Sequence, residues 1–432
     1  MYLSTSRAAD IAAGPPAPKG PLRAVPGTVL ALGLVSLVTD VSAEMVTAVL
    51  PLYLVTVLGM SPLAFGALDG LVQGATALLR VVGGRVSDRT HRRKLVAGTG
   101  YAISAACKAA LLAATAPWSV AVVLAADRTG KGLRTAPRDA LISLSCPPEE
   151  QGRAFGVHRA MDTAGALLGP LAAFGVLWVA VDGYEAVFAV SCCFAVLGVV
   201  VLALFVRESP APAAAPGAGT TSARDLLRIP GLRRLCLTAA ALGLFTVGDA
   251  FLYLLLQRRL DLPVAYFPLL PVGTAAVFLL AALPVGRLAD RLGRHRVFLG
   301  GHLLLSGACL LLLAPVPPGP VLVLGVLGLL GLFYAATDGV LMAAAGPLLP
   351  AGLRTTGLAV LQTAQALARF AGSLLFGAAW TLWGPGPALG VAAGGLLLVL
   401  AAVEAAGRRP RGGRSRAPRG DPSANRGAAR GR

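Results

Sequence analysis

Long apolar stretches recur along the whole chain, separated by short polar connections. Twelve can be delimited, at residues 27–49, 62–84, 95–114, 118–141, 153–178, 184–206, 233–257, 264–288, 297–314, 320–349, 355–380 and 385–406. Each has about 18 residues or more, which is enough for a helix to cross a bilayer. Because backbone groups in lipid must bond within their own segment, we predict an all-α membrane protein with twelve transmembrane helices.

The pattern also repeats once along the chain. The segment GGRVSDRTHRR matches PVGRLADRLGRHR, so that Asp290 lies 202 residues after Asp88, and SAAC recurs as SGAC at the same offset. We therefore predict two pseudo-symmetric six-helix bundles, at 27–206 and 233–406, joined by a Pro/Ala/Gly-rich linker at 207–232. In transporters built from such repeats, the substrate site lies near the middle of the membrane between the halves.

Charge is scarce but unevenly placed. Only 13% of the residues are charged, yet the net charge is +18, and nine Arg against one acid lie from Arg408 onward. Arg clusters also follow the second and eighth stretches, whereas the connections GMSP, TAPWS and APVPPGP carry no Lys or Arg. This asymmetry predicts a multi-pass protein of the inner or plasma membrane, with the N-terminal tail (1–26), the linker and the basic tail (407–432) in the cytoplasm.

The net charge therefore does not point to nucleic acid. The basic tail either touches anionic lipid or is simply solvated, and both interpretations stay open. Six scattered cysteines have no CxxC spacing, and no nucleophile–base pair or metal-ligand cluster is visible. Residues 1–25 lack the apolar core of a cleavable signal peptide. We expect neither an enzyme nor a cofactor.

The repeated Asp motif resembles the signature of the major facilitator superfamily, G-x-L-a-D-r-x-G-r-r, and the resemblance covers essentially the whole chain. The matching residues are Gly84, Asp88, Arg89 and Arg92 in the first copy, with His91 where glycine is usual, and Gly286, Asp290, Arg291 and Gly293 in the second. The resemblance implies a gate, in which Gly lets two helices approach and Asp holds a neighbouring helix end in one conformation, with Arg138 a candidate partner of Asp88. The alternative is a basic loop that only sets topology.

The fourth stretch raises a separate question, because residues 124–142 hold six charged side chains. Asp127 and Arg128 are predicted about 14 Å deep, where charges usually face a cavity or each other. Asp127 and Lys131 are four residues apart, so we expect them to pair, for a structural purpose alone or as part of the site. Arg128 begins a segment that resembles the family's R-x-x-x-G pattern, whose Arg is associated with proton coupling.

The fifth stretch carries two further patterns. Gly165, Gly169 and Pro170 resemble the family's G-x-x-x-G-P motif, which marks exporters that exchange substrate for protons; plain helix packing is the alternative. His158, Arg159 and Asp162 share a helical face and are expected to enter from the cytoplasmic side toward the fourth stretch.

Asp40 and Glu44 lie four apart on the first stretch. Two carboxylates on one face of a poorly hydrated cavity are not expected to be ionised together, so this pair is our candidate proton carrier. Alternatively, one of them is permanently paired with Arg128 or Arg159. In the second half, the polar residues at depth are Asp249, Asp338, Gln362, Gln365 and Arg369.

The sequence predicts a monomeric secondary transporter of a small molecule, without the P-loop that ATP-driven pumps need. We expect proton-coupled export of a small drug-like or metabolic compound. The alternative is proton-coupled import of an organic anion, because Arg128, Lys131 and Arg159 would make a cationic cavity. A non-transporting receptor or scaffold is a third possibility, against which the duplicated gate motif argues. The expected partners are the substrate, protons and lipid.

Overall fold

The computed structural model describes residues 26–72, 92–147, 150–180, 182–206, 226–349 and 354–408. Within these ranges the chain consists of helices and their connections, without strands. The N-terminal half contains α1 (Gly27–Leu52), the π-helical η1 (Tyr53–Val57), a helical segment at 62–72, α3 (Arg93–Ala113), α4 (Pro117–Leu144), α5 (Gln151–Val179) and α6 (Tyr184–Phe205). The all-α prediction is confirmed.

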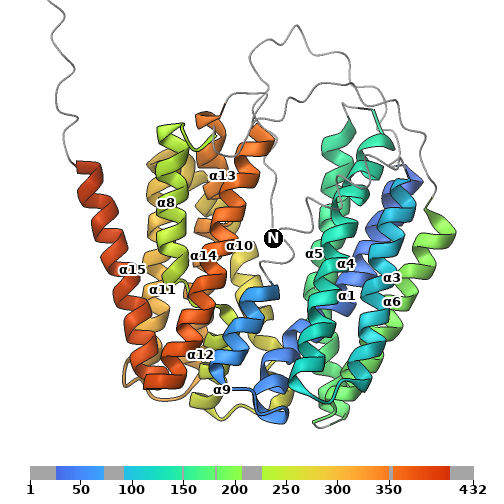
Figure 1. Cartoon of the computed structure of the whole chain (residues 1–432), viewed down its shortest axis with the longest axis horizontal. Coiled ribbons are helices and arrows are strands. Elements are labelled where there is room, and N and C mark those ends of the chain that lie inside the picture. Colours follow the sequence, from blue (N-terminus) through green and yellow to red (C-terminus); the bar gives the residue numbers. More distant parts are fainter. Residues whose placement is uncertain are drawn as a thin grey trace, which may run out of the picture.

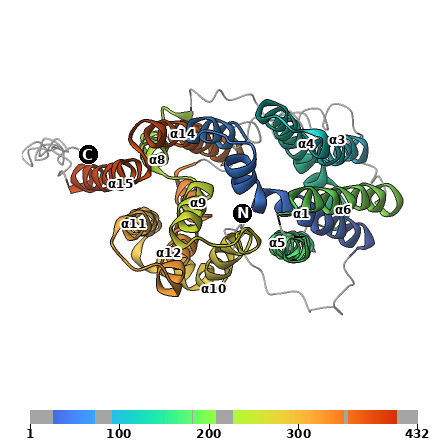
Figure 2. The same ribbon diagram turned by 90° about the horizontal axis from the view of Figure 1, so that it is seen from below.

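The C-terminal half begins with a helix in two pieces and ends with two long unbroken helices of 30 and 24 residues. Its elements are α8 (Pro230–Phe245), α9 (Asp249–Leu260), η3 (Val264–Tyr266), α10 (Leu269–Leu292), α11 (Arg294–Leu313), α12 (Pro320–Thr337), α13 (Val340–Ala345), η4 (Gly346–Leu348), α14 (Arg354–Trp383) and α15 (Pro385–Arg408). The two halves stand side by side (Figures 1 and 2).

Nine of the described helical segments are long and apolar enough to cross a membrane. The charged α4 and α14 are not among these nine, although they are 28 and 30 residues long and run alongside the others (Figure 1). Of the second predicted stretch the structure describes only 62–72. The membrane fold is therefore established, whereas the count of twelve spans stays a prediction.

Two predicted spans are interrupted near their middle. The chain leaves helical conformation between α8 and α9, and again between α12 and α13, where Gly339 has a φ of +79° that disfavours any other residue. These breaks place Asp249 in the first turn of α9 and Asp338 at the C-cap of α12. Broken helices deep in a membrane are tolerated where they line a cavity, so both carboxylates lie where a ligand site is expected.

The two halves touch at one end of the bundle. We call the end where α1 begins and α15 ends the terminal end (Figure 1). At the opposite end, the rings of Phe65 and Phe251 lie 4.9 Å apart, and Ser373 donates a hydrogen bond of 2.9 Å to Asp69. The backbone N–H of Leu63 also donates to Thr381 at 3.1 Å. In Figure 1 the ribbons of the two halves diverge from this junction toward the terminal end.

Candidate functional site

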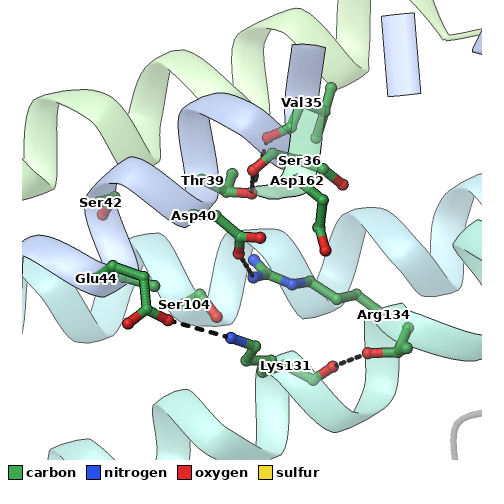
Figure 3. A network of polar contacts seen from close by, with 12 residues as sticks. Val35, Ser36, Thr39, Asp40, Ser42, Glu44, Ser104, Lys131, Arg134 and Asp162 are labelled. Atoms are coloured by element: carbon green, nitrogen blue, oxygen red, sulfur yellow. Dashed lines mark hydrogen bonds and ion pairs between the residues drawn. The ribbon is translucent and has the colours of Figure 1, made fainter. Parts of the chain in front are cut away.

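A network of charged side chains joins α1, α4 and α5 inside the N-terminal half (Figure 3). Asp40 and Glu44 both point from α1 toward α4, as their spacing predicts. The carboxylate of Asp40 lies 3.8 Å from the guanidinium of Arg134, and that of Glu44 lies 3.9 Å from the ammonium of Lys131. The alternative prediction, that one of these carboxylates pairs with Arg128 or Arg159, is wrong. Each of the two contacts a different cation of α4.

Asp162 completes the network from α5. Its carboxylate is 3.0 Å from Arg159, which lies three residues earlier on the same helix, and 3.7 Å from Arg138. The carboxyl groups of Asp40 and Asp162 also lie within electrostatic range of each other. Two ionised carboxylates in such range repel each other, so a proton on one of them is favoured. The site therefore offers a place for one exchangeable proton between α1 and α5.

His158 does not join this network. The side chain is buried, at 2% exposure, and both ring nitrogens lack a hydrogen-bond partner among the described residues. The expected cluster of His158, Arg159 and Asp162 is thus reduced to the last two.

The predicted pair of Asp127 with Lys131 is wrong. Asp127 instead forms a buried ion pair of 3.1 Å with Lys108 of α3, while Lys131 faces Glu44. The cause is the close crossing of α3 and α4, where a Cβ on Gly130 would come within 2.6 Å of the Gly100 carbonyl oxygen. This crossing brings Lys108 against Asp127, and a buried ammonium without a counter-charge would be costly.

Lys108 and Arg134 are the residues that sequence reasoning missed. A lysine inside an apolar stretch is itself a signal of a functional or paired charge, so Lys108 was detectable. Both residues line a small cavity with Asp127, Lys131, Tyr101 and Ser104. The guanidinium of Arg134 lies 4.4 Å from the Tyr101 ring centre, a cation–π contact that holds it toward α3 as well as toward Asp40.

Arg128 stands apart from these ion pairs. Its Nη2 donates a long hydrogen bond of 3.4 Å to Thr47 of α1, and its Nε is buried without a partner. Within the described ranges, no carboxylate lies within 4.0 Å of its guanidinium. The R-x-x-x-G arginine is therefore the cation of α4 that is left without a direct counter-charge.

The helix 5 motif is a packing site. A Cβ on Gly165 would overlap the Leu37 carbonyl oxygen, and one on Gly169 would lie 2.7 Å from the Cβ of Glu44. The two glycines thus let α1 and α5 touch, as predicted, and Pro170 follows within α5. Because Gly169 packs directly against Glu44, the motif also sets the position of a carboxylate in the charged network.

The gate motif is described only in part. Gly84, Asp88 and Arg89 lie outside the described residues, so the expected pairing of Asp88 with Arg138 is untested. Arg92 is exposed at the N-cap of α3. Arg138 bonds to Asp139, Ser36 and Asp162.

In the second copy, Asp290 pairs with Arg294 at 3.3 Å, and Arg294 donates to the Ala343 carbonyl at 2.7 Å, so this turn is tied to α13. A Cβ on Gly286 would meet nothing within 4 Å, so the expected close helix approach there is wrong in this conformation. Gly293, with a φ of +96°, is required by the turn. Arg291 lies in the last turn of α10 and is exposed.

The C-terminal half carries a smaller polar cluster around the α8–α9 break. Tyr334 donates its hydroxyl hydrogen to the carboxylate of Asp249, and Tyr253 bonds to Thr274 at 2.9 Å. Arg369 lies within electrostatic range of Asp249, as do Asp69 and Asp338. No group of three or more His, Cys, Asp or Glu in the described ranges could hold a metal ion.

Comparison with known proteins agrees with this arrangement. The family model of the Major Facilitator Superfamily matches residues 32–373 and 234–428. An uncharacterized MFS-type transporter of Methanocaldococcus jannaschii is 28% identical over 364 residues, which are 81% of this chain and 88% of the relative. The multidrug resistance protein MdtH of Cronobacter sakazakii is 33% identical over 114 residues, but these are only 26% of this chain and 28% of that protein.

Solved structures share the fold at low identity. The nucleoside transporter NupG matches with a TM-score of 0.74 at 14% identity, covering 88% of this chain and 99% of that one. A peptide transporter, POT, matches with a TM-score of 0.74 at 16% identity, covering 89% and 95%. These similarities establish the architecture, and they leave the substrate and the direction of transport to the chemistry of the site.

Proposed function

Because the chain belongs to the Major Facilitator Superfamily, we propose that it exports a small molecule across the cell membrane in exchange for protons. Membership in this family makes it a membrane transporter and not an enzyme. What the family alone does not specify is the coupling ion, the direction and the substrate.

The observation that carries the proton proposal is the cluster of Asp40 of α1 and Asp162 of α5 with three guanidinium groups. Arg134, Arg138 and Arg159 stand within 4 Å of one carboxylate or the other, and the two carboxylates lie in electrostatic range of each other. Losing a proton from this pair adds a negative charge that the guanidinium groups attract. Protonation and deprotonation thus change the attraction between α1, α4 and α5, which is what coupling to a conformational change requires.

Two observations favour export. The Gly165–Pro170 motif matches the exporter pattern, and its Gly169 packs against Glu44 in the charged network. Part of the chain is also similar to a multidrug resistance protein. Import of an organic anion with protons is the second candidate, and it is favoured by the uncompensated guanidinium of Arg128.

The orientation follows from the positive-inside argument. With both termini in the cytoplasm, the junction at Phe65, Asp69 and Ser373 lies on the outer side. The described conformation is then the inward-facing one, closed outside and divergent toward the cytoplasm.

The test is transport in vesicles of defined orientation. Inside-out membrane vesicles are placed in a medium that contains compounds from a panel of drugs and metabolites, and a pH gradient is imposed with either the lumen or the medium acidic. Accumulation in inside-out vesicles with an acidic lumen, abolished by a protonophore, is the result expected for export by antiport. Accumulation driven only by acid on the other face would instead establish symport, and flux unaffected by either gradient would refute proton coupling.

A further inference from the structure

Among the cations of α4, which the structure describes completely, Arg128 alone has no ion pair within 4.0 Å to a described carboxylate. Each of the carboxylates Asp40, Glu44, Asp127 and Asp162 lies within 4 Å of a Lys or Arg. Arg128 shares none of these contacts; it reaches only the hydroxyl of Thr47, with its Nε buried and without a partner. A guanidinium has five N–H donors in a planar fork, so most of its bonding capacity is unused here.

The C-terminal half presents the opposite imbalance. The bonds to the Asp249 carboxylate that the structure resolves come from the neutral hydroxyl of Tyr334. Arg369 is in electrostatic range of Asp249, and no ion pair within 4.0 Å joins the two. Among the described residues, Asp249 is therefore bonded by a neutral hydroxyl and has no cation in direct contact.

Arg128 and Asp249 lie at the same depth along the helices. Arg128 is eleven residues from Pro117, where α4 begins, and Asp249 is eleven residues from Leu260, where α9 ends. At 1.5 Å per residue, both are about 16 Å from the end opposite the termini.

They also face the same junction. Thr47, the partner of Arg128, is exposed between buried neighbours on α1, and α1 and α9 are in contact across the two halves (Figure 2). Directly beyond this level the halves are closed by Phe65 against Phe251, two residues after Asp249. A molecule entering from the terminal end would therefore stop with Arg128 on one side and Asp249 on the other.

Charges at mid-membrane are expensive unless they are matched, and they usually mark the path of a substrate. We propose that the transported compound is a zwitterion, whose anionic group binds Arg128 and whose ammonium group binds Asp249. A purely anionic compound would leave Asp249 unmatched, and a purely cationic one would leave Arg128 unmatched. The proposal rests on the proposed function only in that the chain carries a small molecule; it requires neither proton coupling nor a direction.

The experiment is equilibrium binding to the purified full-length chain in detergent at pH 7, without any gradient. The probes are free amino acids and small amino-carboxylate compounds, each with its N-acetylated counterpart, which is an anion, and its methyl ester, which is a cation. We expect at least one series in which the zwitterion binds tenfold or more tightly than both counterparts. If no zwitterion in the panel is preferred over its singly charged counterparts, the proposal is overturned.

Variants then assign the two groups. In Arg128→Gln the zwitterion should bind no better than its methyl ester, and in Asp249→Asn no better than its N-acetyl form. Arg128→Lys keeps the charge and should keep part of the preference, which guards against a glutamine variant that does not fold. Arg296→Gln and Asp261→Asn make the same chemical changes at exposed positions and should bind as the unchanged protein does.

Loss of the preference for the carboxylate in Arg128→Gln and of the preference for the ammonium in Asp249→Asn supports the assignment of the two groups. An Asp249→Asn protein that loses proton-driven transport but still prefers the free amine would overturn it. Because binding is measured without a membrane, failure of proton-coupled export would leave this result standing, and the two failures are distinguishable.

Discussion

Asp40 is the side chain on which proton coupling is expected to depend most. We predict that Asp40→Asn abolishes uphill transport while substrate exchange down a gradient persists, because an amide keeps the size of the carboxyl and cannot gain or lose a proton. The measurement is pH-driven accumulation beside counterflow in the same vesicles, with at least a tenfold loss expected in the first alone.

Glu44→Gln is the matched control for this change. It removes a carboxylate from the same face of α1, but one that faces Lys131 rather than a second carboxyl. We expect it to retain partial uphill transport. Equal and complete loss in both variants would show that any charge change on this face disables the protein, and normal uphill transport in Asp40→Asn would move the proton site elsewhere.

Also at the residue scale, the buried ion pair of Lys108 with Asp127 is expected to stabilise the fold. Their side chains are only 4% and 6% exposed, so removing one leaves a buried charge unmatched. We predict that Lys108→Met or Asp127→Leu alone lowers the free energy of unfolding by about 3–5 kcal/mol, whereas the double variant loses much less. Thermal unfolding in detergent measures this, and additive losses would refute a structural pair.

This pair also shows where sequence reasoning ends at this scale. The spacing of Arg159 and Asp162 put both side chains on one helical face, and the structure pairs them there. Asp127 and Lys131 satisfied the same rule and yet do not pair, since the crossing of α3 and α4 at Gly100 and Gly130 offers Asp127 a better partner. Contacts set by tertiary crossings have no local signature.

At the scale of elements, Gly169 determines how closely α5 approaches α1. We predict that Gly169→Ala lowers the thermal midpoint and transport rate, because the added Cβ would lie 2.7 Å from that of Glu44 and 2.8 Å from the Val41 carbonyl oxygen. Overpacking of this kind costs about 1–3 kcal/mol. Gly175→Ala, on the same helix, is the matched control, since a Cβ there meets nothing within 4 Å.

The two variants have the same helix propensity change, so any difference between them reports packing. If both behave alike, the close approach of α1 and α5 is not required, and the glycines of the exporter motif act in some other way. The same comparison tests whether the role of Glu44 in transport depends on its position, because a displaced α1 should also change the pH profile of transport.

The predicted stretches that the structure describes are helical, but two of them are not continuous helices. Residues 233–257 and 320–349 read as single apolar stretches, whereas the structure interrupts both, at 246–248 and around Gly339. Apolar composition identifies what lies in the membrane, and it says little about whether the helix is continuous there. Gly248 and Gly339 lie at the breaks that position Asp249 and Asp338, but both stretches hold other glycines inside continuous helix, so glycine alone does not mark the break.

At the scale of the whole molecule, the duplicated motif identified the fold and the family. It could not indicate which end of the bundle is closed, because alternating conformations are built from one sequence and differ only in contacts between distant residues. The bond from Ser373 to Asp69 joins positions 304 residues apart. Such contacts appear only once the halves are placed together.

The closed end therefore allows a direct test of alternation. The backbone of Leu63 bonds to the side chain of Thr381, so cysteines at these two positions would lie close together in the described conformation and far apart once this end opens. The background is a variant without the six native cysteines. Oxidation of the double variant Leu63→Cys/Thr381→Cys in this background should lower the transport rate at least tenfold while substrate binding persists. A reductant should restore transport. Each single variant is the control for the chemistry of oxidation. Undiminished transport by a fully cross-linked protein would mean that this junction never opens, and that the substrate does not pass between the halves here.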